Sequence, residues 1–297
     1  MNRPPLFGIA LALAGVLVLT PDTLLMRLSG LSGWAMLAWR GLGMASVFLF
    51  VWALTARDRR HDLAMLYTGA GTAVVLCQIA NQTFFNLGVA AAPVAMVLFG
   101  VAAVPVFSAG FAWILVREPT HPATWVATLF VFLGIAVAAS GKSVEGVEFE
   151  TSALLGGLAG LGVAAGLAGS FVLIRLTSGL SILLTIGVGS AFSAILGAAL
   201  AGPQALYDGT LWPILLAAFV VLPFAFGAMS CASRHTQAAN VSLILLLETV
   251  LGPLWVWAGV GEAPTPRMML GGVIVVATLA GYIAITARRS MRAPPIA

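Results

Sequence analysis

Two stretches of this sequence match each other at a separation of 144 residues: WILVREPTHP at residues 113–122 and WAGVGEAPTP at residues 257–266. Each stretch contains the end of one apolar segment and the start of the next. The less common residues that recur in register are Trp113 and Trp257, Glu118 and Glu262, and Pro122 and Pro266. The match predicts an internal repeat in which the fourth and fifth apolar segments correspond to the ninth and tenth.

Apolar segments of membrane-spanning length surround both stretches. A helix needs about 20 residues to cross a hydrocarbon core of about 30 Å. Segments of that order run over residues 5–28, 33–55, 63–86, 92–116, 121–140, 152–175, 181–201, 211–233, 238–260 and 265–287. We therefore predict an all-α integral membrane protein with ten transmembrane helices, formed by two five-helix repeats over residues 1–145 and 146–297. Because five is an odd number, the second repeat is inverted relative to the first, and such repeats commonly enclose a central cavity.

The composition agrees with a chain whose solvent is lipid. Hydrophobic residues make up 61% of the 297 residues and charged residues only 8%, against about 25% charged residues in soluble domains. The net charge of +4 does not indicate nucleic-acid binding, because the basic residues occur in short clusters between apolar segments. Arg3 and the apolar residues 6–19 are similar to a secretory signal, but no small-residue cleavage site precedes Thr20. We predict a first membrane helix instead.

Arginine and lysine residues predict the orientation of the helices. With the N-terminus in the cytoplasm, ten of them fall on the cytoplasmic side and three outside, as the positive-inside rule requires. The cytoplasmic set is Arg3, Arg57, Arg59, Arg60, Arg117, Arg175, Arg234, Arg288, Arg289 and Arg292. The external set is Arg27, Lys142 and Arg267. We expect a multi-pass protein of the bacterial inner membrane with both termini in the cytoplasm.

The ninth segment contains a recognisable order of residues. RHTQAANVSLILLLE runs over residues 234–248, and Gly261-Glu262 follows after the rest of the segment. This order of a small-residue helix start, an apolar run, a glutamate and a terminal Gly-Glu resembles the signature of the EamA family in the drug/metabolite transporter superfamily. The first repeat has the same frame in Val104-Pro105 and Arg117-Glu118, but Val104 replaces the family's acidic residue and Thr249 replaces its proline. Further matching basic positions are Arg27, Arg40 and Arg175.

The overall pattern is most similar to the YddG-type aromatic amino acid exporters of that family. The resemblance implies a secondary transporter that exports aromatic and other apolar amino acids by alternating access. Its partners would then be the small-molecule substrate and the lipid bilayer, with no nucleic acid, and we expect it to function as a monomer. Two alternatives stay open: a transporter of the same fold for other small metabolites or cationic drugs, and a membrane enzyme or scaffold without transport.

The third segment provides the richest set of polar candidates for substrate binding. Gln78, Asn81 and Gln82 share one helix face by their i, i+3, i+4 spacing. Uncharged amides can hold both ends of a zwitterion without the desolvation cost of fixed ions, so we predict that this face lines a central cavity. Interhelical hydrogen bonding is the alternative role. Asn240 in the ninth segment is a weaker candidate of the same kind.

Charged residues inside lipid are costly and are therefore candidates for function. Glu248 lies about ten residues into its segment, or ~15 Å deep, where it could couple to protons, bind a substrate ammonium group or form a structural hydrogen bond. We favour the structural role and expect Glu248→Gln to keep substantial transport. Arg40 could bind a substrate carboxylate or bond exposed carbonyls. Asp22 follows Pro21, which breaks a helix, and it either faces the pathway or ends that helix.

Aromatic residues and helix breakers complete the candidate set. Phe99 and Trp255 lie deep enough to contact an apolar substrate side chain, with core or lipid packing as the alternative. Kink sites in the fourth and ninth segments could act as hinges. They are Gly100, Pro105, Gly252 and Pro253.

The sequence contains no P-loop, H-E-x-x-H or G-x-S-x-G motif. His61, His121 and His235 lie in predicted cytoplasmic loops, and Cys77 and Cys231 lie in apolar segments without C-x-x-C spacing. We therefore predict that the protein is not an enzyme and has no catalytic residues, no metal site and no cofactor.

Overall fold

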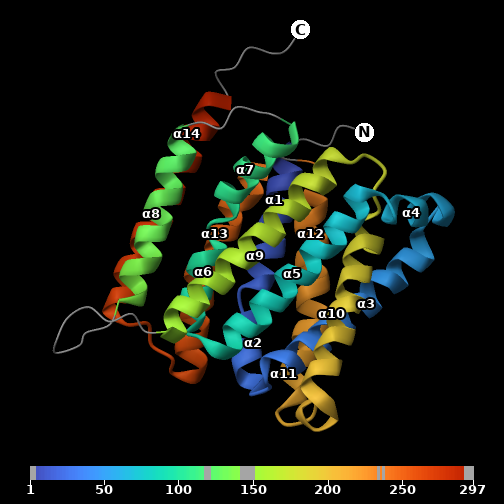
Figure 1. Ribbon diagram of the computed structural model, residues 1–297, viewed down its shortest axis with the longest axis horizontal. Coiled ribbons are helices and arrows are strands. Elements are labelled where there is room, and N and C mark those ends of the chain that lie inside the picture. The colour runs from blue at the N-terminus through green and yellow to red at the C-terminus, as the bar shows by residue number, and fades with distance from the viewer. Residues whose placement is uncertain (1–4, 117–121, 141–150, 233–234, 236–237, 291–297) are drawn as a thin grey trace.

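The computed structural model describes residues 5–116, 122–140, 151–232, 235 and 238–290. Within these ranges the chain forms helices and no strand. The helices are α1 (Pro5–Leu19), α2 (Asp22–Ser29), α3 (Gly33–Thr55), α4 (Arg59–Leu66), α5 (Gly69–Ala91), α6 (Val94–Val101), α7 (Val104–Val116), α8 (Pro122–Ala139), α9 (Thr151–Leu176), α10 (Ile182–Ala205), α11 (Leu211–Leu216), α12 (Leu222–Ala232), α13 (Ala238–Val260) and α14 (Pro266–Ser290). The start of α1 and the end of α14 lie at the same end of the molecule (Figure 1).

Among the residues that the structure describes, seven helices or runs of consecutive helices are long and apolar enough to cross a membrane. They are Phe7–Ser29, Gly33–Thr55, Gly69–Ala91, Val94–Leu115, Thr151–Leu176, Ile182–Ala205 and Leu211–Ala232. Shorter apolar stretches occur at Leu129–Ala138, Leu247–Val260 and Pro266–Thr278, within α8, α13 and α14. These helices support a multi-pass membrane protein, while the ten-helix arrangement in two repeats stays a prediction.

The first segment is divided into two helices, as the sequence around Pro21 indicates. Because Pro21 has no N–H to donate and its ring disturbs the preceding turn, α1 ends at Leu19 and α2 begins at Asp22. The second helix is short because Gly30, with φ of 62°, adopts the left-handed conformation that ends helices. The break places the backbone around Thr20 and Asp22 inside the bundle, where both side chains are buried.

The third segment differs from the prediction, which placed it at residues 63–86. The structure forms a separate helix α4, none of whose residues is buried, and α5 then begins at Gly69. Two N-cap residues cause this division: Asp58 accepts a hydrogen bond from the His61 N–H, and Thr68 accepts one from the Gly71 N–H. Apolar content alone could not separate the two helices.

The eighth segment contains a π-helical turn, Ala217–Val221, between α11 and α12. Pro223 follows this turn, and in a regular α-helix its ring would press on the carbonyl of residue 219. The wider π-helical turn gives the proline ring room. It also offsets α12 relative to α11.

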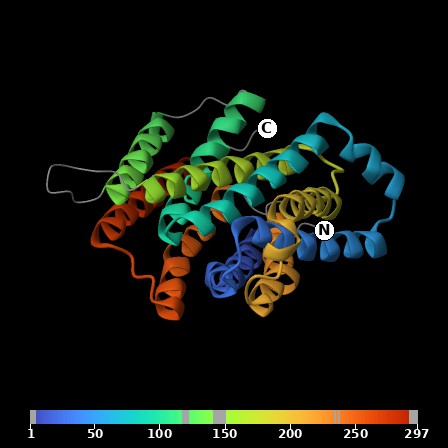
Figure 2. The ribbon, with the colours of Figure 1, turned by 60° about the horizontal axis from the view of Figure 1, so that its bottom comes forward.

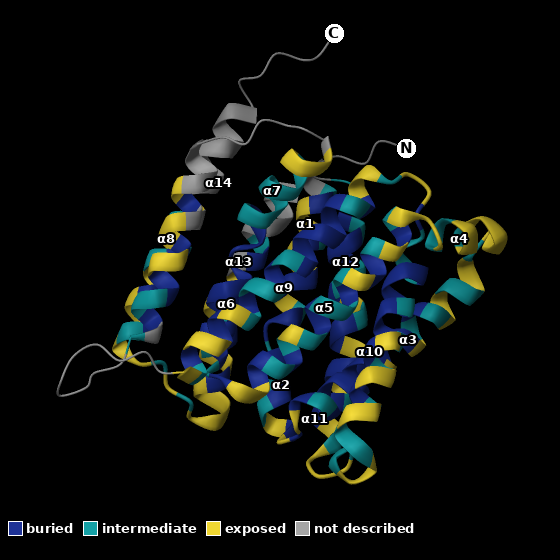
Figure 3. Cartoon of the chain, viewed as in Figure 1, coloured by how far each residue is buried: buried dark blue, intermediate teal, exposed yellow. Residues whose placement is uncertain are grey.

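The helices pack in pairs that are distant in sequence. α3 packs against α10, α5 against α9, α1 against α12, and α8 against α14. The α8–α14 pair stands at one edge of the molecule and α4 at the opposite edge (Figure 2). Buried residues concentrate in the middle of the bundle, and exposed residues cover its outer faces (Figure 3). Many of the exposed residues are large and apolar, such as Phe50 and Leu54, which is the surface that a lipid solvent favours.

Candidate functional site

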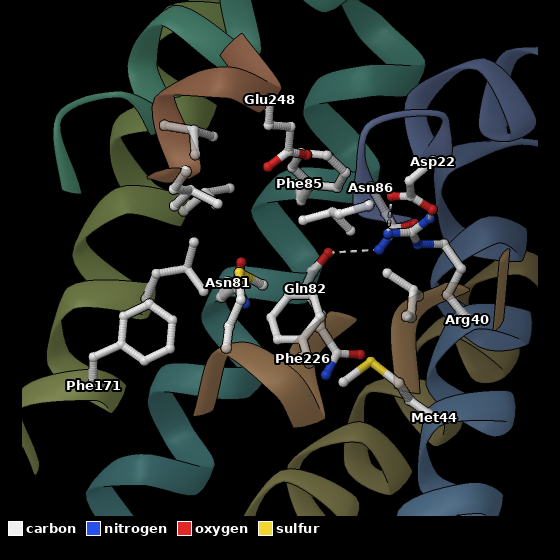
Figure 4. A pocket seen from close by; sticks show the side chains of 17 residues that line it. Asp22, Arg40, Met44, Asn81, Gln82, Phe85, Asn86, Phe171, Phe226 and Glu248 are labelled. Carbon is white, nitrogen blue, oxygen red and sulfur yellow. Dashed lines mark hydrogen bonds and ion pairs between the residues drawn. The ribbon is translucent and has the colours of Figure 1, made fainter. Parts of the chain in front are cut away.

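A cavity lies inside the bundle, beside the break between α1 and α2. Side chains from several helices point towards this common space (Figure 4). Its polar residues are Asp22, Arg40, Asn81, Gln82, Asn86 and Glu248. Its larger apolar residues include Met44, Phe85, Phe171, Phe226 and Met229. An apolar cavity with a few converging polar groups is the usual composition of a small-molecule site.

Asp22 and Arg40 form a buried ion pair at one side of the cavity. Nη1 of Arg40 donates to Oδ1 of Asp22 at 2.5 Å, and Nη2 donates to Oδ2 at 2.8 Å. The guanidinium group also lies 5.6 Å from the centre of the Phe85 ring. The carboxylate therefore neutralises Arg40 in a two-bond geometry, and the arginine predicted to bind a substrate carboxylate is already occupied by Asp22.

The amide residues of α5 divide into those that line the cavity and one that does not. Asn81 and Gln82 line it, as does Asn86 one turn further along. Gln82 donates to the Ser190 hydroxyl of α10 at 2.8 Å. Gln78 is buried but lies outside the cavity lining, where it accepts a bond of 3.3 Å from Asn81. The part of α5 that lines the cavity is thus shifted along the helix by about one turn from the predicted part, away from Gln78 and towards Asn86.

Of the two polar side-chain atoms of Asn86, only one has a hydrogen-bond partner among the described residues. Its Nδ2 donates to the backbone carbonyl of Gln82 at 2.7 Å. Because a carbonyl can only accept, this bond fixes which end of the amide is the nitrogen. Its Oδ1 is buried and has no hydrogen-bond partner among the described residues, so the wall of the cavity carries an unused acceptor here.

Glu248 points into the cavity from α13 (Figure 4). Its side chain is only 5% exposed, and the described part of the chain gives its carboxyl group no hydrogen-bond or ion-pair partner. The sequence favoured a structural hydrogen bond to a neighbouring helix, and no such bond is found among the residues that the structure describes. The structural role of Glu248 therefore stays a prediction, and among the described residues its carboxyl group is an acidic group on the cavity wall without a partner.

Three other predicted binding residues are not placed in the cavity lining. Phe99 is buried in the core of the bundle, with its ring against Gly272 of α14. Trp255 is exposed, and its Nε1 donates to the Thr20 hydroxyl at 3.2 Å, which stabilises the break after α1. Asn240 belongs to the backbone of α13, but its side chain lies outside the described residues. The alternative role of packing, open for both aromatic residues, agrees with their positions.

The predicted hinge residues have different surroundings in the fourth and ninth segments. The fourth segment is divided into α6 and α7, with Gly100 just before the division and Pro105 just after it. A Cβ atom on Gly100 would lie 2.7 Å from the Cα of Gly160, so this glycine allows α6 and α9 to approach closely. By contrast, α13 continues through Gly252 and Pro253. Whether any of these positions moves stays a prediction.

Sequence reasoning missed most of the apolar wall. Phe85 could have been found, because it lies three residues after Gln82 on the same helix face. Phe171 and Phe226 had no such signal, since each is one apolar residue among many in an apolar helix. Their convergence depends on helix packing, which periodicity does not give.

A second ion pair joins the end of α2 to the segment that follows α13. Nε of Arg27, near the end of α2, lies 2.9 Å from Oε2 of Glu262. Arg27 also donates to the Ala92 carbonyl at 2.7 Å, and the Val94 N–H donates to Oε1 of Glu262 at 3.1 Å. We call these four residues the α2 latch. The latch joins the end of α2 to the connection between α5 and α6 and to the segment after α13.

Comparisons with known proteins identify part of the chain. Residues 6–140 match the EamA-like transporter family. This EamA-like domain contains Asp22, Arg40 and the amides of α5, and it ends before Glu248. The match and the apolar spans together support a membrane transporter, which is the coarser part of the sequence prediction.

A solved structure shares the fold of the whole chain. It is a crystal structure of a protein that is 17% identical in sequence, with a TM-score of 0.66 over 96% of this chain and 99% of the other. The coverage extends the shared fold beyond the EamA-like domain to the C-terminal half. A comparison with curated proteins gives no match.

Proposed function

We propose that the protein is a secondary transporter that exports aromatic and other apolar amino acids across the bacterial inner membrane by alternating access. The observation that carries this proposal is the cavity beside the break between α1 and α2. It combines a mostly apolar wall with two carboxyl groups, one guanidinium group and three amides. Irregular backbone at membrane depth is tolerated where it lines a cavity, and the EamA-like domain connects that cavity with transport.

The lining of the cavity suits a single amino acid with an apolar side chain. Phe85, Phe171 and Phe226 offer aromatic surface for a ring, while Met44 and Met229 are flexible enough to fit side chains of different shape.

We also propose that residues 146–297 form a second, inverted copy of the EamA-like domain. The support comes from the recurring Trp, Glu and Pro at a separation of 144 residues and from the fold shared over nearly the whole chain. The cavity agrees with this arrangement, because both halves contribute to its wall.

Alternating access requires one end of the cavity to be closed while the other is open. The α2 latch supplies a closure at one end, through an ion pair and two bonds to backbone groups. The positive-inside rule assigns this end to the outside. The proposed resting state is therefore closed towards the outside.

A second candidate is a transporter of the same fold for amines or other organic cations. The observation in its favour is the unpaired carboxyl group of Glu248 beside an arginine that is already neutralised. A membrane enzyme or scaffold is the third possibility, and it predicts no flux of any small molecule.

The test is flux through the purified protein in liposomes. Vesicles would be loaded with aromatic, aliphatic or charged labelled amino acids, with and without an imposed pH gradient. We expect saturable flux of the aromatic and aliphatic compounds, above that of protein-free vesicles. Met44→Phe should reduce it by filling the cavity, whereas Leu54→Phe, on the exposed side of the same helix, should not. Absence of flux for every compound would refute the proposal.

A further inference from the structure

We infer that the cavity recognises its substrate through an ammonium group bound by Glu248, and that Arg40 does not bind a substrate carboxylate. The inference rests on the proposed transport function and specifies its substrate class. The required features are a protonated amine and an apolar or aromatic body of the size of an amino acid side chain. An amino acid fits this description, but its carboxylate is dispensable, so simple apolar amines fit at least as well.

The first step concerns Arg40, whose donors are directed to Asp22. Both terminal nitrogens bond to the two carboxylate oxygens, and the two side chains are almost completely buried. A substrate carboxylate would have to displace Asp22, which would leave Asp22 as a buried charge without its cation, and such a state is strongly unfavourable. The described lining of the cavity contains no other arginine or lysine. A substrate carboxylate therefore finds no free cationic partner.

The second step concerns Glu248, whose carboxyl group, unlike the guanidinium group of Arg40, has no partner among the described residues. It faces the cavity, is 95% buried, and has no donor among the described residues. A buried polar group without a partner costs free energy, and a ligand that brings donors removes that cost. An ammonium group brings up to three N–H donors and forms charge-assisted bonds to a carboxylate.

The third step concerns the surroundings of Glu248. Asp22 and Arg40 neutralise each other, so the remaining ionisable group of the described lining is the carboxyl group of Glu248. Phe171 and Phe226 line the same cavity, and aromatic rings attract cations as well as apolar groups. Asn86 adds an acceptor that has no partner. The lining thus has spare acceptors and aromatic surface, but its one guanidinium group is occupied.

Three ligands of nearly the same shape separate the two modes of recognition. Phenylalanine has both charged groups, phenethylamine has only the ammonium group, and 3-phenylpropionate has only the carboxylate. Each would be titrated into the purified full-length protein by isothermal calorimetry. Each would also be tested as an inhibitor of amino acid flux in the proposed liposome assay. We expect phenethylamine to bind at least as tightly as phenylalanine, and 3-phenylpropionate to bind at least tenfold more weakly.

Variants then assign the preference to Glu248. Glu248→Gln should weaken phenethylamine binding tenfold or more, and it should remove the difference between the amine and the acid. Asp208→Asn makes the same chemical change at an exposed carboxyl group outside the cavity and should leave binding unchanged. If Glu248→Gln does not fold, the comparison of the three ligands with the native protein still decides.

The outcomes separate this inference from the transport proposal. Flux of phenylalanine with binding of 3-phenylpropionate as tight as that of the amine would overturn ammonium recognition while transport stands. Binding of phenethylamine without flux of any compound would refute transport while the inference stands. An unchanged amine affinity in folded Glu248→Gln would overturn the role of Glu248, and absence of binding by all three ligands would overturn the inference as a whole.

Discussion

Replacing Asp22 by asparagine is expected to destabilise the protein, because Arg40 then keeps a buried charge without its counterion. Both guanidinium nitrogens bond to the carboxylate, at 2.5 and 2.8 Å, and the side chains of Arg40 and Asp22 are 6% and 1% exposed. Asparagine has nearly the same size but can accept only one of the two bonds. Removal of one partner from a buried ion pair costs about 3–5 kcal/mol. At about 1.4 kcal/mol for each factor of ten, the ratio of folded to unfolded protein falls by more than about a hundredfold.

Two matched double variants isolate the effect of the unpaired charge. Asp22→Asn with Arg40→Met removes both charges, and since apolar replacement of a complete buried pair is often neutral, we expect it to be more stable than Asp22→Asn alone. Arg27→Gln with Glu262→Gln removes the ion pair of the α2 latch, whose side chains are 24% and 32% exposed. Solvent screening limits that loss to about 1 kcal/mol or less.

The assay is unfolding of the purified proteins in mild detergent as the fraction of dodecyl sulfate is raised. Tryptophan fluorescence and gel filtration would follow the folded fraction. Asp22→Asn should unfold at a clearly lower sulfate fraction than the native protein and both double variants. Unfolding of Asp22→Asn together with the native protein, or a double variant with Arg40→Met that is less stable than the single one, would show that the argument from buried charge is wrong.

Three further outcomes follow from the packing, the cavity and the predicted topology. Gly160→Ala should lower expression and stability, because its Cβ would overlap the carbonyl oxygen of Val97. Gly110→Ala meets open space within a helix and should be neutral or slightly stabilising. Equal thermal stability of the two variants would contradict this expectation. In a cysteine-free background, Gln82→Cys should react with a water-soluble thiol reagent and be protected by substrate, while Gln78→Cys should be inert. The reverse order would place the cavity nearer the Gln78 end of α5. Reporters fused to the two chain ends should both be active in the cytoplasm, and opposite sides would rule out ten spans.

The sequence predicts the apolar segments well, because the need for lipid-compatible surface acts on every residue of a span. It also places Arg27 and Glu262 on the same side of the membrane, and the structure pairs them. Helix boundaries at Asp58 and Thr68 were available from capping patterns but are obscured by the continuous apolar content around them. Local signals of this kind are weak beside the hydropathy of a membrane helix.

Partner choice among charged residues could not be predicted. Asp22 and Arg40 are 18 residues apart on helices separated by a turn, and each allowed several roles when considered alone. The pairing depends on the rotation of α2 and α3 about their axes, which is set by packing against other helices. In the same way, the packing of α5 against α10 places Gln78 next to Gly189. Residue spacing could therefore predict the polar face of α5, but not which part of that face lines the cavity.

The interruption after Leu19 has an energetic consequence for exchange between states. α1 packs against α12 and α13, whereas α2 packs against α11, α13 and α5, so the two parts of one span have largely different neighbours. A rearrangement of α2 alone disturbs eight residues and the α2 latch, while the contacts of α1 with α12 remain. In the proposed alternating-access cycle, the activation barrier for a movement of α2 alone would include only the interactions of this short helix. The rate of exchange would then depend on far fewer residues than those of a full transmembrane helix.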